Sequence, residues 1–93
     1  MKLPTRYSEL TSYQKRLVRE EYIKRQDGNC MYCRQPLSGP PSDYAQGREL
    51  NLTLFPANFL DHPVHLQHDH FTGMTEGAVH AHCNGVLWQY HGR

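Results

Sequence analysis

The sequence lacks both a long apolar run and an apolar N-terminal stretch. No run of about 18 apolar residues is present, so no segment is expected to cross a bilayer. The opening residues, MKLPTRY, lack the apolar stretch of a secretory signal. We therefore expect a protein that has no membrane partner and stays in a cytoplasm.

Cysteine and core-forming residues are also scarce. Three cysteines cannot all pair within one chain, and a reducing compartment disfavours disulfides. With 93 residues, of which 38% are hydrophobic, the chain is expected to form a single domain over residues 1–93. A domain of this size hides a smaller share of its surface than a larger one does. A structural metal would supply the missing stability, so metal ligation is the favoured use of the cysteines.

Two pairs of residues have the spacing of zinc ligands. Cys30 and Cys33 are separated by two residues, and His80 and Cys83 repeat that gap. Four protein ligands leave no vacancy on a tetrahedral ion, so this zinc is expected to be structural. His82 is an alternative to His80, but it lacks the matching spacing. Buried or redox-active cysteines are the alternative to metal binding, although a redox motif needs its own fold context.

Positive charge is concentrated at the N-terminal end. Residues 1–34 carry eight Lys or Arg against four Asp or Glu, whereas the rest carry two against five. Residues 1–29 are predicted to form a basic helical arm, with a helix over residues 12–26. Thr11 and Gln14 fit a capping box at its start, and Gly28 is a plausible stop. Its basic residues are either a solvated helix face or a phosphate-contacting surface: Lys15, Arg16, Arg19, Lys24 and Arg25.

The remaining pattern predicts an α+β fold. An apolar stripe that includes Tyr13 and Leu17 should face the core. Residues 35–49 are expected to form an exposed loop within an insertion at about 35–60, and residues 50–54 alternate as a half-buried strand would. Residues 64–70 and 78–83 are predicted to pair as a hairpin around the turn at Thr72 and Gly73. A short helix should run from Asn84 to a stop at Gly92.

Several groups suited to chemistry are left unused by zinc. Two histidines flank a carboxylate at His68, Asp69 and His70, and Asn84 follows the last zinc ligand. Hydrolysis of a phosphodiester needs a base that activates water and a cation that neutralises charge developing on the phosphate. Histidine suits the first task, and oxygen ligands that hold Mg²⁺ suit the second.

At these residues the sequence resembles the HNH endonucleases, most closely the phage recombination endonuclease VII branch. That branch carries an Asp-His-Asp-His-x-x-Gly run and a later Cys-x-x-Cys-Asn within a ββα-metal (His-Me finger) core. The matching segments are residues 67–73 (QHDHFTG) and 80–84 (HAHCN). The resemblance covers about residues 30–92, apart from the middle loop.

The resemblance implies a metal-dependent DNA endonuclease with a zinc-stapled ββα core over residues 30–93. It implies that His68 is the general base, that Asn84 is an oxygen ligand of a catalytic Mg²⁺ or Mn²⁺, and that His70 assists at the phosphate. A domain this small is expected to need a homodimer, or a phage packaging or recombination partner, for targeting. A phage origin would place it in the host cytoplasm.

Gln67 departs from the family pattern. An Asp or His that helps to bind the cation is usual at this position, whereas an amide contributes no charge. Cation affinity should therefore fall, or depend more on Asp69 and the phosphate. A shifted match makes Asp69 the ligand and His70 the base, but it aligns the glycine turn less well. The asparagine that orients the base in many HNH enzymes has no counterpart, and a backbone carbonyl is the expected substitute.

Two other classes of protein are alternatives. A non-catalytic zinc module would bind DNA or a protein through the basic helix and the aromatic residues Trp88 and Tyr90. A nucleobase deaminase would need a His-x-Glu element and a Pro-Cys-x-x-Cys element around one catalytic zinc. Neither element is present, so the deaminase class is excluded.

Overall fold

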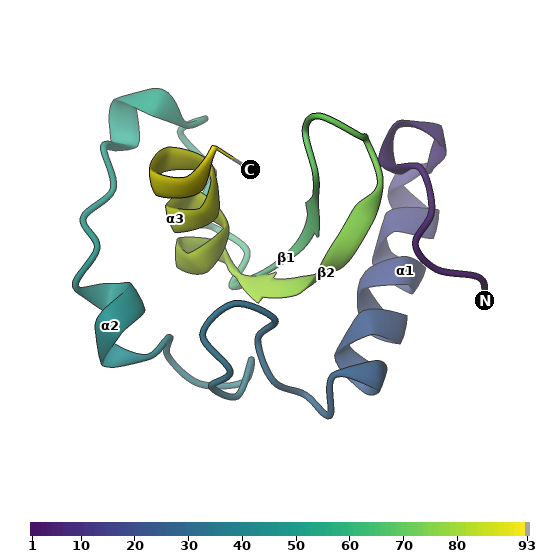
Figure 1. Ribbon diagram of the computed structural model, residues 1–93, viewed down its shortest axis with the longest axis horizontal. Helices are drawn as coiled ribbons and strands as arrows, with labels where there is room; N and C mark the ends of the chain where they lie inside the picture. The colour runs from purple at the N-terminus through teal and green to yellow at the C-terminus, as the bar shows by residue number, and fades with distance from the viewer. Residues whose placement is uncertain (93) are drawn as a thin grey trace.

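A two-stranded antiparallel hairpin forms the centre of the fold, with helices on either side (Figure 1). The computed structural model describes residues 1–92, and it confirms the α+β class. In chain order the elements are the 3-10 helix η1 (Tyr7–Glu9), α1 (Ser12–Arg25), α2 (Asp43–Gln46), the 3-10 helix η2 (Leu52–Leu54), β1 (Val64–His68), β2 (Thr75–His80) and α3 (Ala81–His91). Within residues 1–92, no helix is long and apolar enough to span a membrane.

The hairpin ends earlier at its turn than the sequence pattern predicts. The side chain of Asp69 accepts hydrogen bonds from the backbone N–H groups of Phe71 (2.7 Å) and Thr72 (3.0 Å), and Gly73 has a φ of +78°. This Asx turn starts at Asp69, so β1 stops at His68 instead of residue 70. The second strand was predicted at residues 78–83 and lies instead at Thr75–His80, because α3 already begins at Ala81.

A bulge interrupts the hairpin beside the predicted general base. Gln67 pairs with Gly77 and His68 pairs with Thr75, so Glu76 has no directly opposed residue. Bulges bend a strand and re-aim its side chains, and they are common next to active sites. The extra residue, Glu76, lies on β2, so this strand is expected to bend opposite Gln67 and His68.

The N-terminal helix α1 packs against both strands of the hairpin. The predicted capping box at Thr11 and Gln14 is confirmed, and the turn after α1 includes Gly28 with a φ of +77°. Farther along, the Gln26 amide donates to the Ala78 carbonyl and accepts from the Ala78 N–H, at 2.9 Å each, so it extends the edge of β2. The predicted apolar stripe is only partly correct, because Tyr13 is 61% exposed.

The middle segment contains two short helices and no strand. Residues 35–49 include α2, whose N-cap Ser42 accepts from the Ala45 N–H. The strand predicted at residues 50–54 is wrong. Asn51 caps the 3-10 turn η2 through the N–H of Thr53 (3.2 Å), and this segment has no neighbouring strand to pair with. Alternating apolar residues form a strand only when a partner strand is available.

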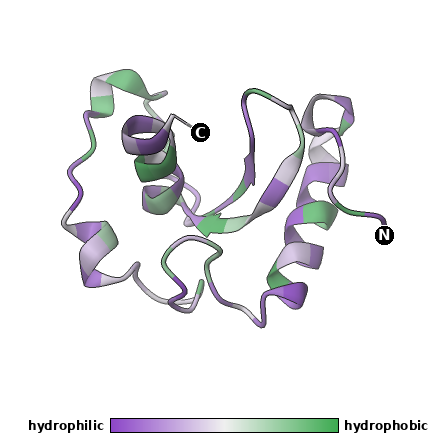
Figure 2. Cartoon of the chain, in the orientation of Figure 1, coloured by the Kyte–Doolittle hydropathy of each residue, from purple (hydrophilic) through white to green (hydrophobic). Residues whose placement is uncertain are grey.

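The main core lies where β2, α3 and the turn after α1 meet. Its buried members are Cys30, Leu37, Ala45, Ala78, Val79, Cys83 and Leu87. Figure 2 shows hydrophobic residues in β2 and α3, whereas the exposed side of α1 is largely hydrophilic. Since two cysteines belong to this small core, whatever the cysteines bind also determines how the core is held together.

Candidate functional site

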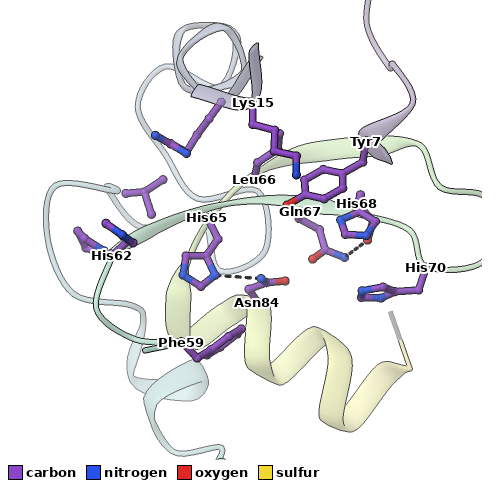
Figure 3. Close-up of a pocket in the computed structure, with 13 residues that line it drawn as sticks. Tyr7, Lys15, Phe59, His62, His65, Leu66, Gln67, His68, His70 and Asn84 are labelled. Carbon is purple, nitrogen blue, oxygen red and sulfur yellow. Dashed lines mark hydrogen bonds between the residues drawn. The ribbon is translucent and has the colours of Figure 1, made fainter. Parts of the chain in front are cut away.

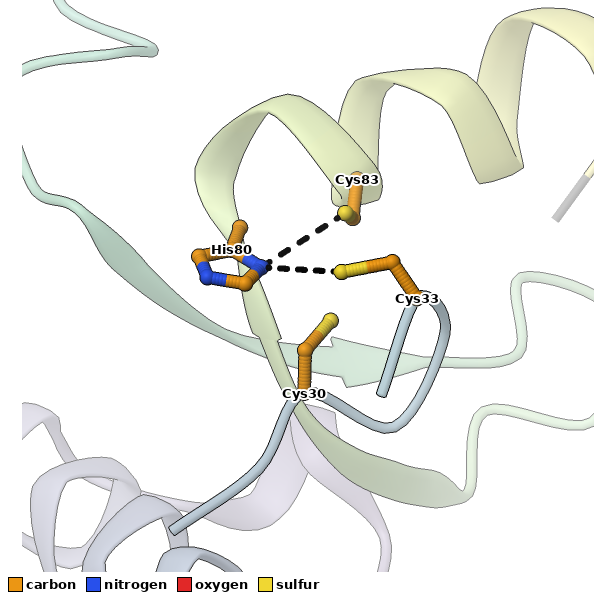
Figure 4. Close-up of side chains that lie close together, drawn as sticks. All are labelled: Cys30, Cys33, His80 and Cys83. Atoms are coloured by element: carbon orange, nitrogen blue, oxygen red, sulfur yellow. Dashed lines mark hydrogen bonds between the residues drawn. The ribbon is translucent and has the colours of Figure 1, made fainter. Parts of the chain in front are cut away.

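Four side chains from three parts of the fold converge on one point (Figure 4). Cys30 and Cys33 lie on the turn after α1, His80 ends β2, and Cys83 lies in the first turn of α3. Their ligand atoms all lie within 4.8 Å of one another, and they form a cysteine–histidine cluster that can bind zinc. These are the four residues whose spacing predicted a zinc site.

The geometry of the cluster fits a tetrahedral zinc ion. Zinc–sulfur bonds of about 2.3 Å and zinc–nitrogen bonds of about 2.0 Å require a nitrogen–sulfur separation of about 3.5 Å. The Nδ1 atom of His80 lies 3.4 Å from the Cys33 sulfur and 3.7 Å from the Cys83 sulfur. On the other side of the ring, Nε2 donates to the carbonyls of Pro36 (2.9 Å) and Gly39 (3.1 Å). These two hydrogen bonds place the ring proton on Nε2 and leave a free lone pair on Nδ1, as is usual for a metal-bound histidine.

The thiols of the cluster favour a bound cation. A hydrogen bond from Cys83 is the main cause that lowers the pKa of Cys30 to about 4, and the same contact with Cys30 raises the pKa of Cys83. Without a cation, two adjacent thiolates repel each other, so one sulfur keeps its proton. A divalent ion removes this conflict because it stabilises every thiolate that coordinates it.

His82 has a different task. Its Nε2 atom lies 2.8 Å from the carbonyl of Ala45 and 3.0 Å from that of Arg48. The ring therefore fastens the C-terminal end of α2 to the start of α3, and it is absent from the cluster formed by His80 and Cys83. The choice of His80 over His82 as the predicted ligand agrees with this arrangement.

A separate set of side chains lines a cleft of about 580 Å³ (Figure 3). Its walls come from the N-terminal segment, α1, the segment before β1, β1 itself and α3. The lining residues are Tyr7, Lys15, Arg19, Phe59, His62, Pro63, Val64, His65, Leu66, Gln67, His68, His70 and Asn84. The cleft therefore brings together four residues of the predicted catalytic centre, Gln67, His68, His70 and Asn84, with two of the five basic residues.

His68, the predicted base, is held by an aromatic stack. The Tyr7 ring lies 3.9 Å from the His68 ring, nearly parallel at 11°, and the Lys15 ammonium lies 4.2 Å above the Tyr7 ring. Burial, followed by the nearby His70 and Lys15, lowers the pKa of His68 and favours the neutral imidazole. The stack with Tyr7 supports the His68 ring, for which a backbone carbonyl was the expected support.

The N-terminal segment places Tyr7 because it runs along the turn end of β2. The N–H of Tyr7 donates to the carbonyl of Gly73 (2.9 Å), and the N–H of Thr75 donates to the carbonyl of Thr5 (2.8 Å). These bonds join residues that are far apart in the sequence, so no local pattern could reveal them.

Asn84 projects from the first half of α3 into the cleft and contacts His65. The Asn84 amide nitrogen lies 3.0 Å from Nδ1 of His65. Phe59 meets the His65 ring edge-on, with centroids 4.9 Å apart and planes at 87°. Burial is the main cause that lowers the pKa of His65, so its neutral form is favoured. The sequence pattern did not single out His65, although it lies three residues before His68.

The other predicted catalytic residues are placed less favourably. Gln67 lines the cleft but is only 1% exposed, and its amide nitrogen donates to the carbonyl of His68 (3.0 Å). Asp69 is absent from the lining because its carboxylate caps the hairpin turn. His70 lies on the rim with its ring 4.6 Å from that of His68. This placement disfavours Asp69 as a cation ligand and, with it, the shifted match.

The basic residues of α1 divide into two groups. Lys15 and Arg19 line the cleft. Arg16 lies 3.8 Å from Glu20, and Arg25 donates to Glu21 at 2.8 Å, so both are paired along the helix. Lys24 is exposed and lies outside the lining. Of the five predicted phosphate contacts, Lys15 and Arg19 are therefore the ones that the fold directs toward the candidate catalytic residues.

Comparisons with protein families, with curated proteins and with solved structures find no match to this chain.

The cluster predicts a zinc-dependent fold with a specific histidine ligand. We expect the purified protein to carry one zinc ion, and Cys30→Ser or His80→Gln to lose it together with the cooperative melting transition. His82→Gln is the matched control and should keep its zinc even if its melting temperature falls. Elemental analysis and circular dichroism measure both properties. Full zinc content and an unchanged melting temperature in His80→Gln would refute the ligand assignment.

Proposed function

We propose that the protein is a metal-dependent DNA endonuclease of the ββα-metal type, with a structural zinc in the cysteine–histidine cluster. One observation carries the proposal: a neutral histidine, His68, and an amide on a helix, Asn84, line the same cleft as Lys15 and Arg19. A base, a cation ligand and phosphate-binding charges are the groups that phosphodiester hydrolysis needs. The order of β1, β2 and α3 supports the fold assignment.

The proposed reaction is attack of water on a backbone phosphate. His68 takes a proton from the water as its oxygen bonds to phosphorus, and the bond from phosphorus to the leaving sugar oxygen breaks. The leaving oxygen then gains a proton from solvent. Lys15 and Arg19 hold the phosphate backbone, Tyr7 keeps the His68 ring in place, and His70 assists at the phosphate from the rim.

Asn84, with help from Gln67, would hold a divalent cation such as Mg²⁺ or Mn²⁺. When bound, this ion neutralises charge on the phosphate and the leaving oxygen. The zinc of the cluster has a separate task, because four protein ligands leave no position for substrate.

A non-catalytic zinc module that binds DNA or a protein is the second candidate. The observation in its favour is the neutral, buried amide of Gln67 in place of a charged cation ligand. Such a module would still use Lys15 and Arg19 to contact phosphates, and Trp88 and Tyr90 are exposed enough to contact a partner. The module differs from the nuclease in one property: it binds DNA without cutting it.

Plasmid cleavage distinguishes the two candidates. In Mn²⁺ or Mg²⁺, wild type should nick or linearise supercoiled DNA, and His68→Ala should lower the rate by about 10²- to 10⁴-fold because the general base is lost. Asn84→Ala should also cut slowly, with partial recovery at high cation concentration. His91→Ala, an exposed histidine at the end of α3, is the control and should cut normally. If zinc-loaded wild type binds the DNA and leaves it intact, the non-catalytic zinc module is favoured.

The division of the basic residues predicts which of them contact DNA. Replacing Lys15 and Arg19 by Ala should weaken binding of a labelled duplex, and each lost phosphate contact should reduce the slope of log affinity against log salt by about 0.9. Arg25→Ala is the control, because its side chain is paired with Glu21. Fluorescence anisotropy without added divalent cation measures both quantities. An equal loss of affinity in Arg25→Ala would contradict a binding role specific to the cleft.

A further inference from the structure

The cleft has an unusual set of side chains for a site that binds Mg²⁺. Four histidines line it, His62, His65, His68 and His70, together with two amides and two basic residues, and none of the described lining residues is Asp or Glu. Mg²⁺ prefers oxygen ligands in a strict octahedron and is usually held through one or two carboxylates. Imidazole nitrogen is a better ligand for transition metals. The composition of the lining therefore bears on which cation the cleft takes.

His65 and Asn84 point their polar atoms at each other across the cleft wall (Figure 3). Their nitrogens are 3.0 Å apart, which is close to the separation of two neighbouring ligand atoms on one metal ion. The hydrogen bond makes Nδ1 of His65 the acceptor, so this atom carries a lone pair. Rotating the Asn84 amide by half a turn exchanges its nitrogen for its oxygen. The pair then offers one imidazole nitrogen and one amide oxygen to the same point.

Contacts with Asn84 and Phe59 limit the orientation of the His65 ring. The Nδ1 atom of the His65 ring is directed at the Asn84 amide, 3.0 Å away. The edge of Phe59 further limits rotation of the ring. His65 is thus held with its lone pair facing the cleft before any ion arrives.

We propose that His65 and Asn84 together bind the divalent cation of the cleft, and that this site takes a transition metal ion such as Mn²⁺ in preference to Mg²⁺. The proposal deepens the endonuclease assignment and rests on it, since it names the ligand and the class of ion in the same cleft. It also explains how the cleft can work with Gln67 where a charged ligand is usual. The imidazole of His65 supplies the additional strong ligand, from a position two residues earlier on β1.

The test measures binding of Mn²⁺ to the zinc-loaded full chain, and the electron paramagnetic resonance signal of free Mn²⁺ reports how much ion remains unbound. Wild type should bind one Mn²⁺ and keep it in excess Mg²⁺. His65→Phe retains a ring to pack against Phe59 but has no nitrogen, and it should bind Mn²⁺ at least about tenfold more weakly, the minimum loss when even an outer-shell partner is removed. His91→Phe, at the exposed end of α3 and outside the cleft lining, is the control and should bind like wild type. Zinc content and melting temperature are measured for each variant.

A second variant covers the case in which His65→Phe fails to fold. His65→Gln replaces the imidazole nitrogen with an amide, and it should narrow the preference for Mn²⁺ over Mg²⁺. An unchanged preference in this variant, or wild-type Mn²⁺ affinity in a folded His65→Phe, would overturn the proposal.

Plasmid cleavage by the same samples separates this proposal from the proposed function. If Mn²⁺ binds through His65 but the protein does not cut DNA, the proposed endonuclease function is refuted and the metal site stands. If folded His65→Phe cleaves DNA with Mg²⁺ at the wild-type rate, the role of His65 is refuted and the proposed endonuclease function stands.

Discussion

Convergence of Cys30, Cys33, His80 and Cys83 is the interaction on which the rest of the structure depends. The main buried cluster is small, and two of its members are themselves cysteines of this group. A metal at this point joins the turn after α1 to the junction of β2 and α3, which the sparse apolar contacts alone would hold weakly. Free energy of metal binding becomes folding free energy when the unfolded chain has no formed site.

The junction also determines where the candidate catalytic groups lie. Asn84 directly follows Cys83 in the first half of α3, so holding the cysteine in the core directs the next side chain toward the cleft. Strand β1 brings His65, Gln67 and His68 to the same cleft. The N-terminal segment then closes the cleft by stacking Tyr7 on His68. One tight cluster thus supports a site to which it contributes no ligand.

Sequence alone predicted the parts of this arrangement that depend on local spacing. The two-residue gaps at Cys30 and His80, the capping box at Thr11 and the α+β class are all local patterns, and the structure agrees with them. Strand ends were missed because the Asp69 side chain starts the turn early. The prediction of a strand at residues 50–54 was wrong because neither strand of the sheet in residues 1–92 pairs with this segment. Tyr7 and His65 were missed because their roles depend on contacts between distant segments, with His68 and Asn84.

The central proposal is that the cysteine–histidine cluster binds a structural zinc and that the separate cleft lined by His68 and Asn84 cleaves phosphodiester bonds. A crystal structure of His68→Ala with zinc, Mn²⁺ and a short DNA duplex tests it most directly, because this variant should trap uncut DNA and anomalous scattering distinguishes the two metals. We expect zinc among Cys30, Cys33, His80 and Cys83, and Mn²⁺ beside Asn84 with a backbone phosphate facing residue 68. DNA bound on another face, with no phosphate in the cleft, would contradict the account.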